Sequence, residues 1–329
     1  MFNGPLFVVG APRSGTKLFR DLLRQHSRIG IPIYETEYLP RHAHLASELG
    51  ELSDPEAFSR FYAWVTRFMY FKYMAEDGTL IPEQTWREAC RSYDVQGVFE
   101  ALIRHDAEVG PDDIWGDKSP NYRAHLPLLR TLWPQARFIH IIRDARDVCL
   151  SSHKAWKKAV LRNAQRWTDE VAGCRRDGRA LAQAAPGERV YHELRYEDLL
   201  QRPEAELSAV CAFLELPFEE AMTRPGRVSE NLGDTRGEDR IVAGNTEKWR
   251  ERMAPRQLEA VEAICGELLQ DLGYPLVHPV VRPARRLSKP RMTAYQALDA
   301  AQLLRFRVKE WGWRDAVRYT VSAFESTRA

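Results

Sequence analysis

Residues 6–18 of the chain read LFVVGAPRSGTKL, an apolar run that passes through a turn into a polar segment. The run has the continuous apolar character of a strand buried on both faces, and leucines recur at helical spacing after the turn. Two glycines permit a tight connection, and the free N–H groups at the start of a helix attract an anion. The stretch therefore predicts a strand, a phosphate-binding loop and a helix.

The order of residues in this loop differs from that of the Walker A loop of nucleoside triphosphatases. The Walker pattern places Lys directly after its second Gly and then Ser or Thr, whereas here Thr16 comes first and Lys17 second. In the Walker loop the hydroxyl binds magnesium and the Lys reaches the terminal phosphates. Here the first cation is Arg13, directly before Ser14. Such a loop suits the neutralisation of a single phosphate without a metal ion.

Further apolar runs alternate with helical patterns along the chain. Residues 137–142 (RFIHII) predict a second buried strand, and residues 114–116 and 188–194 predict two shorter strands. Amphipathic helices are predicted over residues 203–214 and 255–272. This alternation is typical of a three-layer α/β fold, in which a central parallel β-sheet is flanked by helices.

The bulk properties narrow the range of partners. The 48 Lys and Arg residues nearly balance the 46 Asp and Glu residues, so no overall field favours nucleic acid or a membrane surface. No run approaches the roughly 20 apolar residues that span a bilayer, and the first residues do not resemble a signal peptide. The five cysteines are scattered, without the spacing of a zinc site or a disulfide framework. We expect a cytoplasmic protein without a transmembrane segment, which binds no nucleic acid.

Two motifs resemble those of the nucleotide-dependent sulfotransferase family. The family's 5′-phosphosulfate loop reads Pro-Arg/Lys-Ser-Gly-Thr after the first strand, and residues 12–16 match it. Its 3′-phosphate site has an Arg at a strand end and a Ser eight positions later, matched by Arg143 and Ser151. An Arg and a Ser so spaced can converge on one phosphate. The resemblance implies the P-loop NTPase-like sulfotransferase fold and sulfuryl transfer from 3′-phosphoadenosine 5′-phosphosulfate (PAPS), leaving 3′-phosphoadenosine 5′-phosphate (PAP), with no metal required.

Three further segments are similar to the family: residues 117–120 (DKSP), 196–199 (YEDL) and 245–249 (NTEKW). The last of these resembles the late loop that closes over the nucleotide. Its Trp249 either contacts the adenine or anchors the loop in the core. The resemblance implies donor contacts from Arg13, Ser14, Gly15, Thr16, Lys17, Leu18, Arg143, Ser151, Asn245, Lys248 and Trp249. Near the strand end, Arg146 either reaches the 3′-phosphate or pairs with Asp147.

The resemblance also implies which groups act on the sulfuryl group. In-line sulfuryl transfer, like phosphoryl transfer, depends on positioning and on stabilising the charge of the leaving group. Arg13 is expected to meet that charge at the 5′-phosphate. Lys118, in the DKSP segment, is expected to contact the sulfonate or the bridging oxygen.

The acceptor needs a base, and several residues are candidates. Residues 34–41 (YETEYLPR) resemble the Glu-Thr segment of the tyrosylprotein sulfotransferase subgroup, in which a Glu is the base. Glu35 takes that position and Glu37 is the alternative; a Glu serves if burial or neighbours bring its pKa toward the working pH. The histidines that remain as candidates rank below both carboxylates: His140, His153 and His105.

The chain divides into a sulfotransferase-like domain, residues 1–280, and a C-terminal extension, residues 281–329. A helical acceptor-side insertion at about residues 52–110 is rich in aromatic residues, which either line a pocket or form a helical core. In the extension, basic residues and prolines at 281–291 predict a linker before two helices, about 294–310 and 313–326. These helices pack on the main domain, form a homo-oligomer or contact another surface.

Two other functions fit part of the pattern. A P-loop kinase or nucleoside triphosphatase shares the architecture, but it needs a Walker Lys and a metal-holding acidic residue, for which Asp144 is the candidate. A catalytically inactive nucleotide-binding module would tolerate replacement of Glu35. Tyrosylprotein sulfotransferases are membrane-anchored, and no anchor is expected here. We therefore expect a small-molecule, carbohydrate or lipid acceptor with a hydroxyl or amine.

Overall fold

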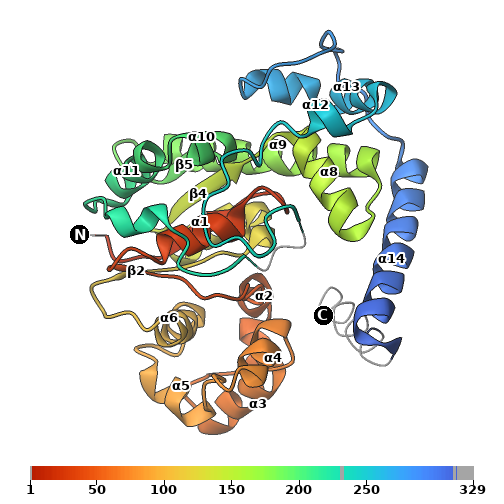
Figure 1. Cartoon of the computed structure of the whole chain (residues 1–329). Helices are drawn as coiled ribbons and strands as arrows, with labels where there is room; N and C mark the ends of the chain where they lie inside the picture. The colour runs from red at the N-terminus through yellow and green to blue at the C-terminus, as the bar shows by residue number, and fades with distance from the viewer. Residues whose placement is uncertain (1, 230–232, 314–315, 317–329) are drawn as a thin grey trace.

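The structure, a computed structural model, describes residues 2–229, 233–313 and 316. Its centre is a five-stranded sheet in the order β2-β3-β1-β4-β5, in which every neighbouring pair is parallel. The strands are β1 (Leu6–Val9), β2 (Ile29–Gly30), β3 (Ile114–Asp117), β4 (Arg137–Ile142) and β5 (Tyr191–Arg195). Helices flank this sheet (Figure 1), which confirms the predicted three-layer α/β fold.

The helices and 3-10 turns of the main domain follow the predicted alternation with strands. In chain order they are α1 (Thr16–Leu23), α2 (Leu39–Leu49), α3 (Pro55–Val65), α4 (Met69–Glu76), α5 (Glu83–Ala89), α6 (Val95–Asp106), η1 (Pro120–Ala124), α7 (Leu126–Leu132), α8 (Ala145–Trp156), α9 (Val160–Ala184), α10 (Tyr196–Gln201), α11 (Pro203–Leu214), η2 (Glu220–Thr223), α12 (Trp249–Arg252) and α13 (Pro255–Asp271). Helix α11 has the predicted bounds, whereas β5 begins three residues later than predicted.

Alternate residues of β1 pack into two different cores, one on each face of the sheet. Leu6 and Val8 belong to a core that includes residues of α1, α10 and α11. Phe7 and Val9 belong to another core, which includes residues of α6 and α7. Because successive side chains of a strand point to opposite faces, a strand covered on both faces needs apolar residues throughout. This is why the run is continuous rather than alternating.

The position of β1 in the sheet sets the place of the site. β1 lies between β3 and β4, and its last residue, Val9, is paired with His140. The chain first adds β2 and β3 on one side of β1, then crosses to β4 on the other. In open parallel sheets, ligands bind beyond the carboxyl ends of the strands where the winding reverses. The loop after β1 and the residues after β4 therefore come together at one edge.

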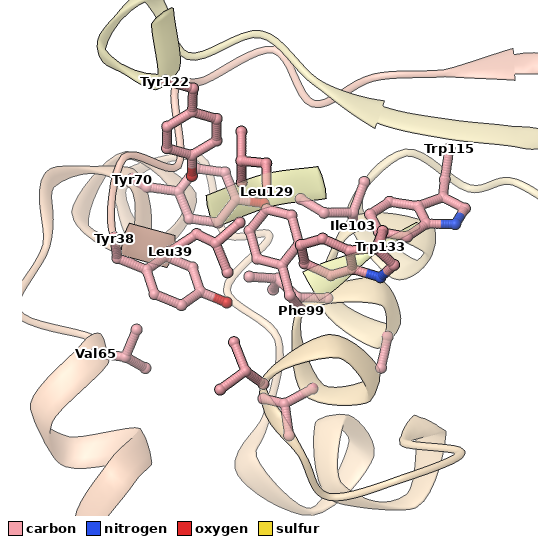
Figure 2. Packing of buried hydrophobic residues seen from close by; sticks show 14 of the residues in the cluster. Tyr38, Leu39, Val65, Tyr70, Phe99, Ile103, Trp115, Tyr122, Leu129 and Trp133 are labelled. Carbon is pink, nitrogen blue, oxygen red and sulfur yellow. The ribbon is translucent and has the colours of Figure 1, made fainter. Parts of the chain in front are cut away.

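The aromatic residues of the helical insertion mostly form a core. Phe58 and Phe61 of α3 and Phe71 of α4 pack around Trp86 of α5, and all four are fully buried or nearly so. Figure 2 shows how this core continues toward the sheet, through Tyr38, Phe99 and other labelled residues to Trp115 and Trp133. Of the predicted alternatives, a helical core therefore holds for most of these residues.

The C-terminal extension begins its helix earlier than predicted. Helix α14 (Lys289–Trp311) includes the last residues assigned to the basic linker, because Pro290 lies in its first turn, where proline is tolerated. α14 lies beside α8 and α9 (Figure 1), and Asp299 accepts hydrogen bonds from the Ala159 amide and from Arg162, each at 2.7 Å. The second predicted helix, over 313–326, falls almost wholly outside the described residues. Within the described part, no helix is long and apolar enough to span a bilayer.

Candidate active site

A cavity of about 980 Å³ lies at the carboxyl edge of the sheet. Each strand leads into residues that line it. The phosphate-binding loop follows β1, residues 33–35 and Glu37 follow β2, Lys118 follows β3, Arg143 follows β4 and Tyr196 follows β5. Parallel pairing brings these carboxyl ends to one edge, so residues far apart in sequence share one cavity.

Among the described residues, the loop between β1 and α1 leaves amide groups without a hydrogen-bond acceptor at the cavity. Its backbone is left-handed at Arg13 (φ 74°) and at Gly15 (φ 92°). The first helical hydrogen bond runs from the Phe19 amide to the Gly15 carbonyl at 3.0 Å, so the amides before Phe19 have no acceptor within the helix. Residues 15–18 line the cavity. The loop therefore offers backbone donors and a helix N-terminus to an anion.

Gly15 is required for a second reason. A Cβ atom at this position would lie 2.3 Å from the ring of Tyr196. Ser14, next to it, is fully buried and does not line the cavity, and its hydroxyl has no hydrogen-bond partner among the described residues. The Ser14 amide donates to the Ala11 carbonyl at 3.1 Å, and the predicted contact of Ser14 with the donor stays a prediction.

The two predicted phosphate sites touch each other. Arg13 Nε donates to Ser151 Oγ at 3.0 Å, and Arg143 Nη1 donates to the Arg13 carbonyl at 3.2 Å. Burial, and then the neighbouring Arg143, lowers the pKa of Arg13 to about 10. The Arg13 guanidinium is therefore charged at neutral pH, and its proximity to Arg143 favours a bound anion.

Arg143 is fixed by the end of the sheet and by a late loop. Its Nη2 donates to the Asn245 carbonyl at 2.8 Å, and its guanidinium lies over the Tyr196 ring, 4.5 Å from the ring centre. Asn245 Nδ2 donates to the Tyr196 hydroxyl at 2.6 Å. Arg143 Nε is buried without a hydrogen-bond partner among the described residues. The predicted residues Arg143, Ser151 and Asn245 are thus brought together with Arg13.

Lys118 and Glu35 form an ion pair on the other side of the cavity. The Lys118 side chain is fully buried, and its ammonium group donates to Glu35 Oε1, while about a third of the Glu35 side chain is exposed. Burial lowers the pKa of Lys118, and the Glu35 carboxylate opposes this shift. The Lys118 ammonium group is therefore shielded from bulk solvent, whereas the Glu35 carboxylate is partly exposed at the cavity.

Glu37 lies beside this pair in an unusual backbone conformation, with φ 54°. Its Oε1 accepts a hydrogen bond from Asn121 Nδ2 at 2.9 Å. Although Glu37 is exposed by surface area, loss of water around its carboxyl group in the cavity, and then the carboxylates of Glu35 and Asp117, raises its pKa to about 7. The residue therefore exchanges its proton near neutral pH.

A buried hydrogen-bond network fixes the segment that carries both carboxylates. Thr36 Oγ1 donates to Asp117 Oδ2 and contacts the Tyr122 hydroxyl at 2.7 Å. Ser119 Oγ also donates to Asp117 Oδ2, at 3.0 Å. Burial raises the pKa of Asp117 to about 6, although these hydrogen bonds lower it. Since Asp117 precedes Lys118, the network holds the Glu-Thr-Glu segment against the lysine.

The structure places Trp249 in the core, not at the cavity. Its ring is buried between Arg146, at 3.6 Å, and Arg250, at 4.4 Å, and it is not among the residues that line the cavity. The predicted adenine contact is therefore replaced by the alternative, a core anchor. Arg146 pairs with Asp144 and Glu262, each at 2.6 Å, so neither expectation for Arg146 is correct.

The other predicted bases lie in unlike surroundings. His140 is buried in β4 against the Tyr191 hydroxyl, 2.7 Å away, and burial lowers its pKa to about 3. His105 lines a different, smaller cavity, whereas His153 is exposed at the rim of the main one. Of the three, only His153 is near the donor residues.

Asp144, the candidate metal-holding residue of a kinase, forms an ion pair with Arg146. Its Oδ1 accepts from the Arg146 amide at 2.8 Å and from Arg146 Nε at 2.9 Å, and its Oδ2 accepts from Nη2. Elsewhere in the described chain, no group of three or more His, Cys, Asp and Glu residues is placed to hold a metal ion. The ion pair leaves neither oxygen of Asp144 available for the role that a kinase requires.

Several cavity residues were not predicted from the sequence. Tyr196 opens the YEDL segment, which resembles the family, and it directly follows β5, as Arg143 follows β4; both were available signals. Lys154 lies three residues after Ser151, on the same face of α8. Trp156, which lies between Arg13 and Lys158, and Asp234, in the segment between η2 and α12, carried no motif.

Comparison with known proteins gives the family. Residues 5–220 match a family model described as the sulfotransferase family. An uncharacterised protein of Aquifex aeolicus is 26% identical over 268 residues, which are 75% of this chain and 30% of that longer protein. A "Putative protein-tyrosine sulfotransferase" of Caenorhabditis briggsae is 27% identical over 230 residues, 67% of this chain and 69% of the relative. The sulfotransferase domain of the Synechococcus PCC 7002 olefin synthase has the same fold, with a TM-score of 0.53 at 22% identity over 84% of this chain and 97% of the domain. Because the family model matches more than half of the chain, the chain belongs to the sulfotransferase family.

Proposed function

We propose that the protein transfers a sulfuryl group from PAPS to a hydroxyl or amine of a small-molecule, carbohydrate or lipid acceptor. One observation carries this proposal: the phosphate-binding loop after β1 and the Arg143–Ser151 pair after β4 meet in one cavity that also holds Lys118, Glu35 and Glu37. A volume of about 980 Å³ is at the upper end of the range for ligand sites. It accommodates a nucleotide and the reacting part of an acceptor.

The donor's two phosphate groups have separate places in this proposal. The 5′-phosphosulfate lies on the amides of residues 15–18, with Arg13 beside it, and the 3′-phosphate lies at Arg143 and Ser151 with Asn245 and Lys248 nearby. The hydrogen bond from Arg13 to Ser151 is then exchanged for bonds to the two phosphates. The buried, unpartnered Nε of Arg143 supports an anion at this place.

The reaction is an in-line displacement at sulfur. The acceptor oxygen or nitrogen forms a bond to sulfur while the bond from sulfur to the bridging oxygen of the 5′-phosphate breaks, and PAP leaves. The acceptor's proton passes to a carboxylate, and the charge that develops on the phosphate is met by Arg13, Lys118 and the loop amides. Positioning and electrostatics do most of this work, because the protein forms no covalent bond.

Glu35 is the proposed base because its contact with Lys118 holds it at the reacting group. Lys118 would contact the sulfonate from the same position, so donor and base are oriented by one side chain. Glu37 is the alternative, since its pKa of about 7 matches a proton acceptor at neutral pH. The two assignments predict that different variants, Glu35→Gln or Glu37→Gln, lose most of the activity.

The acceptor side is more apolar than the donor side. Tyr34 and Tyr73 are stacked, with ring centres 4.9 Å apart, and they line the cavity together with Met69. This wall lies next to Glu35 in sequence and suits an organic acceptor that is partly apolar. A protein tyrosine, suggested by the name of the nematode relative, belongs in an acceptor screen beside phenols, sugars and lipid alcohols.

The test is calorimetric titration with PAP, with ATP and magnesium as the comparator. We expect wild type to bind PAP whether or not EDTA is present, and Arg143→Ala to lose at least tenfold in affinity, the loss of one or two charge-assisted hydrogen bonds. Arg176→Ala, on an exposed part of α9 outside the cavity, controls for the change in charge. Binding of magnesium ATP in place of PAP would support the kinase alternative and overturn the proposal.

A further inference from the structure

A carboxylate already occupies part of the cationic wall of the cavity. Asp234 accepts hydrogen bonds from Lys248 Nζ at 2.5 Å and from Arg252 Nη1 at 2.7 Å through one oxygen, and from Lys154 Nζ through the other. All four residues line the cavity. Burial alone would raise the pKa of Asp234, but the three cations hold it far below its usual range. The carboxyl group is therefore ionised at neutral pH.

This cation cluster (Lys154, Lys248 and Arg252) adjoins the proposed 3′-phosphate site. Lys154 follows Ser151 by three residues and lies on the same face of α8. Lys248 also donates to the side-chain oxygen of Asn245. The backbone carbonyl of Asn245 accepts from Arg143. The cluster is thus linked to both residues that the 3′-phosphate is proposed to contact.

The residue before Asp234 touches the other phosphate-binding group. A Cβ atom at Gly233 would lie 2.8 Å from Arg13 Nη2, so the backbone here packs closely against the guanidinium of the loop. Asp234 and its neighbour therefore lie against groups proposed to bind each of the donor's phosphates. A second anion at this place would meet a carboxylate already hydrogen-bonded to the same cations.

We infer that Asp234 is an internal counter-anion whose carboxylate the 3′-phosphate of the nucleotide displaces from the cluster of Lys154, Lys248 and Arg252. The inference rests on the proposed donor site. A phosphate carries more charge than a carboxylate and has three oxygens, so it can compete for all three cations. The exchange lowers the net gain on binding, because each new contact replaces an existing one. Asp234 thereby limits the affinity for PAP and favours release of the product.

The test compares Asp234→Asn with Glu238→Gln by titration with PAP and with adenosine 5′-monophosphate, which lacks the 3′-phosphate. Glu238 lines the same cavity and pairs with Arg240, so its replacement removes an equal charge outside the cluster. We expect Asp234→Asn to bind PAP roughly tenfold more tightly, with little change for the monophosphate. Glu238→Gln should change either affinity by no more than about twofold.

Other outcomes overturn the inference. If Asp234→Asn bound PAP more weakly, the carboxylate would position the cations for the ligand instead of competing with it. Equal tightening for both nucleotides, or equal tightening in Glu238→Gln, would indicate a general field effect. Asp234→Ala, titrated in parallel, shows whether an effect of Asp234→Asn comes from the new amide group. Thermal melts of both variants show whether each is folded. Wild type that binds no PAP would overturn the donor site itself, whereas binding that needs Arg143 and ignores Asp234 would overturn only this inference.

Discussion

The two halves of the cavity hold their charges in different ways. In the donor half, defined here by the loop after β1 with Arg143, Ser151 and Asn245, the guanidinium groups donate mainly to backbone carbonyls and a hydroxyl. In the reactive half, defined by Asp117, Lys118 and the segment 35–37, charged side chains face one another, and the carboxyl groups of Glu37 and Asp117 have raised pKa values. The carboxylate that Arg143 meets, that of Asp147, lies 3.8 Å away, and a half with weakly paired cations suits a bound anion. A half whose charges are balanced and near titration suits proton transfer.

Replacement of the base is expected to have the largest effect and to separate the two halves most clearly. Glu35→Gln should lower kcat by about 10²–10⁴-fold with PAP affinity within about twofold, because it removes a proton acceptor and no donor contact. Glu37→Gln should lower kcat by less than tenfold. The measurement is steady-state kinetics with PAPS beside PAP titration. The reverse ranking would make Glu37 the base, and two unchanged variants would favour a catalytically inactive nucleotide-binding module.

The network under the reactive half gives the next largest effect, on stability. The pKa of the fully buried Asp117 is raised to about 6, so the folded protein binds this proton more tightly than the unfolded chain does. The free-energy cost of ionising Asp117 in the folded protein is absent below about pH 4, near the ordinary pKa of an Asp side chain. It is complete above about pH 6. Between these values wild type should lose up to about 3 kcal/mol of unfolding free energy relative to Asp117→Asn.

Urea unfolding of both proteins at several pH values measures this difference. Only the pH-dependent part is informative, since the amide also changes the hydrogen bonds from Thr36 and Ser119 by a constant amount. A difference that does not vary between pH 4 and 6 would mean that Asp117 is already ionised and well solvated, and would contradict its place in the network.

A methyl group in the phosphate-binding loop should weaken the donor half alone. Gly15→Ala places a Cβ against the Tyr196 ring and forces a left-handed backbone on Ala, so PAP affinity should fall by tenfold or more. Gly187→Ala is the matched control, because Gly187 has φ +86° with nothing near its Cβ position. If both variants bound PAP like wild type, the loop would not need its present geometry to bind phosphate.

The smallest effect is expected at the contact between β5 and the late loop. Tyr196→Phe removes the hydrogen bond from Asn245 but keeps the ring under Arg143, and a single neutral hydrogen bond contributes about 1 kcal/mol. PAP affinity should therefore fall about threefold to tenfold in the same titration, with kcat little changed. A large loss of kcat with unchanged affinity would place Tyr196 in the reactive half and break the division.

Much of the donor half could be predicted because its signals are local. The apolar run of β1, the glycine turn after it and the spacing from Arg143 to Ser151 all lie within short segments. The parallel sheet then brings the two segments together, which the alternation of strands and helices already implied. The family resemblance, rather than these local signals, placed Lys118 and Glu35 at the site, and it did not reveal that they form an ion pair.

The errors occur where a residue's environment depends on distant parts of the chain. Trp249 follows a motif, yet its ring packs between Arg146 and Arg250 because α8 and α12 meet there. Asp234 carries no motif, and its cations come from α8 and from residues near α12. The aromatic insertion allowed either a pocket or a core, and burial decided for the core.

By itself, the sequence determined most of the strands and the anion-binding loop, because hydrophobic periodicity and glycine conformations are properties of neighbouring residues. Only the tertiary structure decided which charges are buried, which are paired and which titrate near neutral pH. Burial and Coulomb interaction depend on atoms that folding brings within a few ångströms, and Glu35 meets Lys118, as Thr36 meets Asp117, from more than 80 positions away.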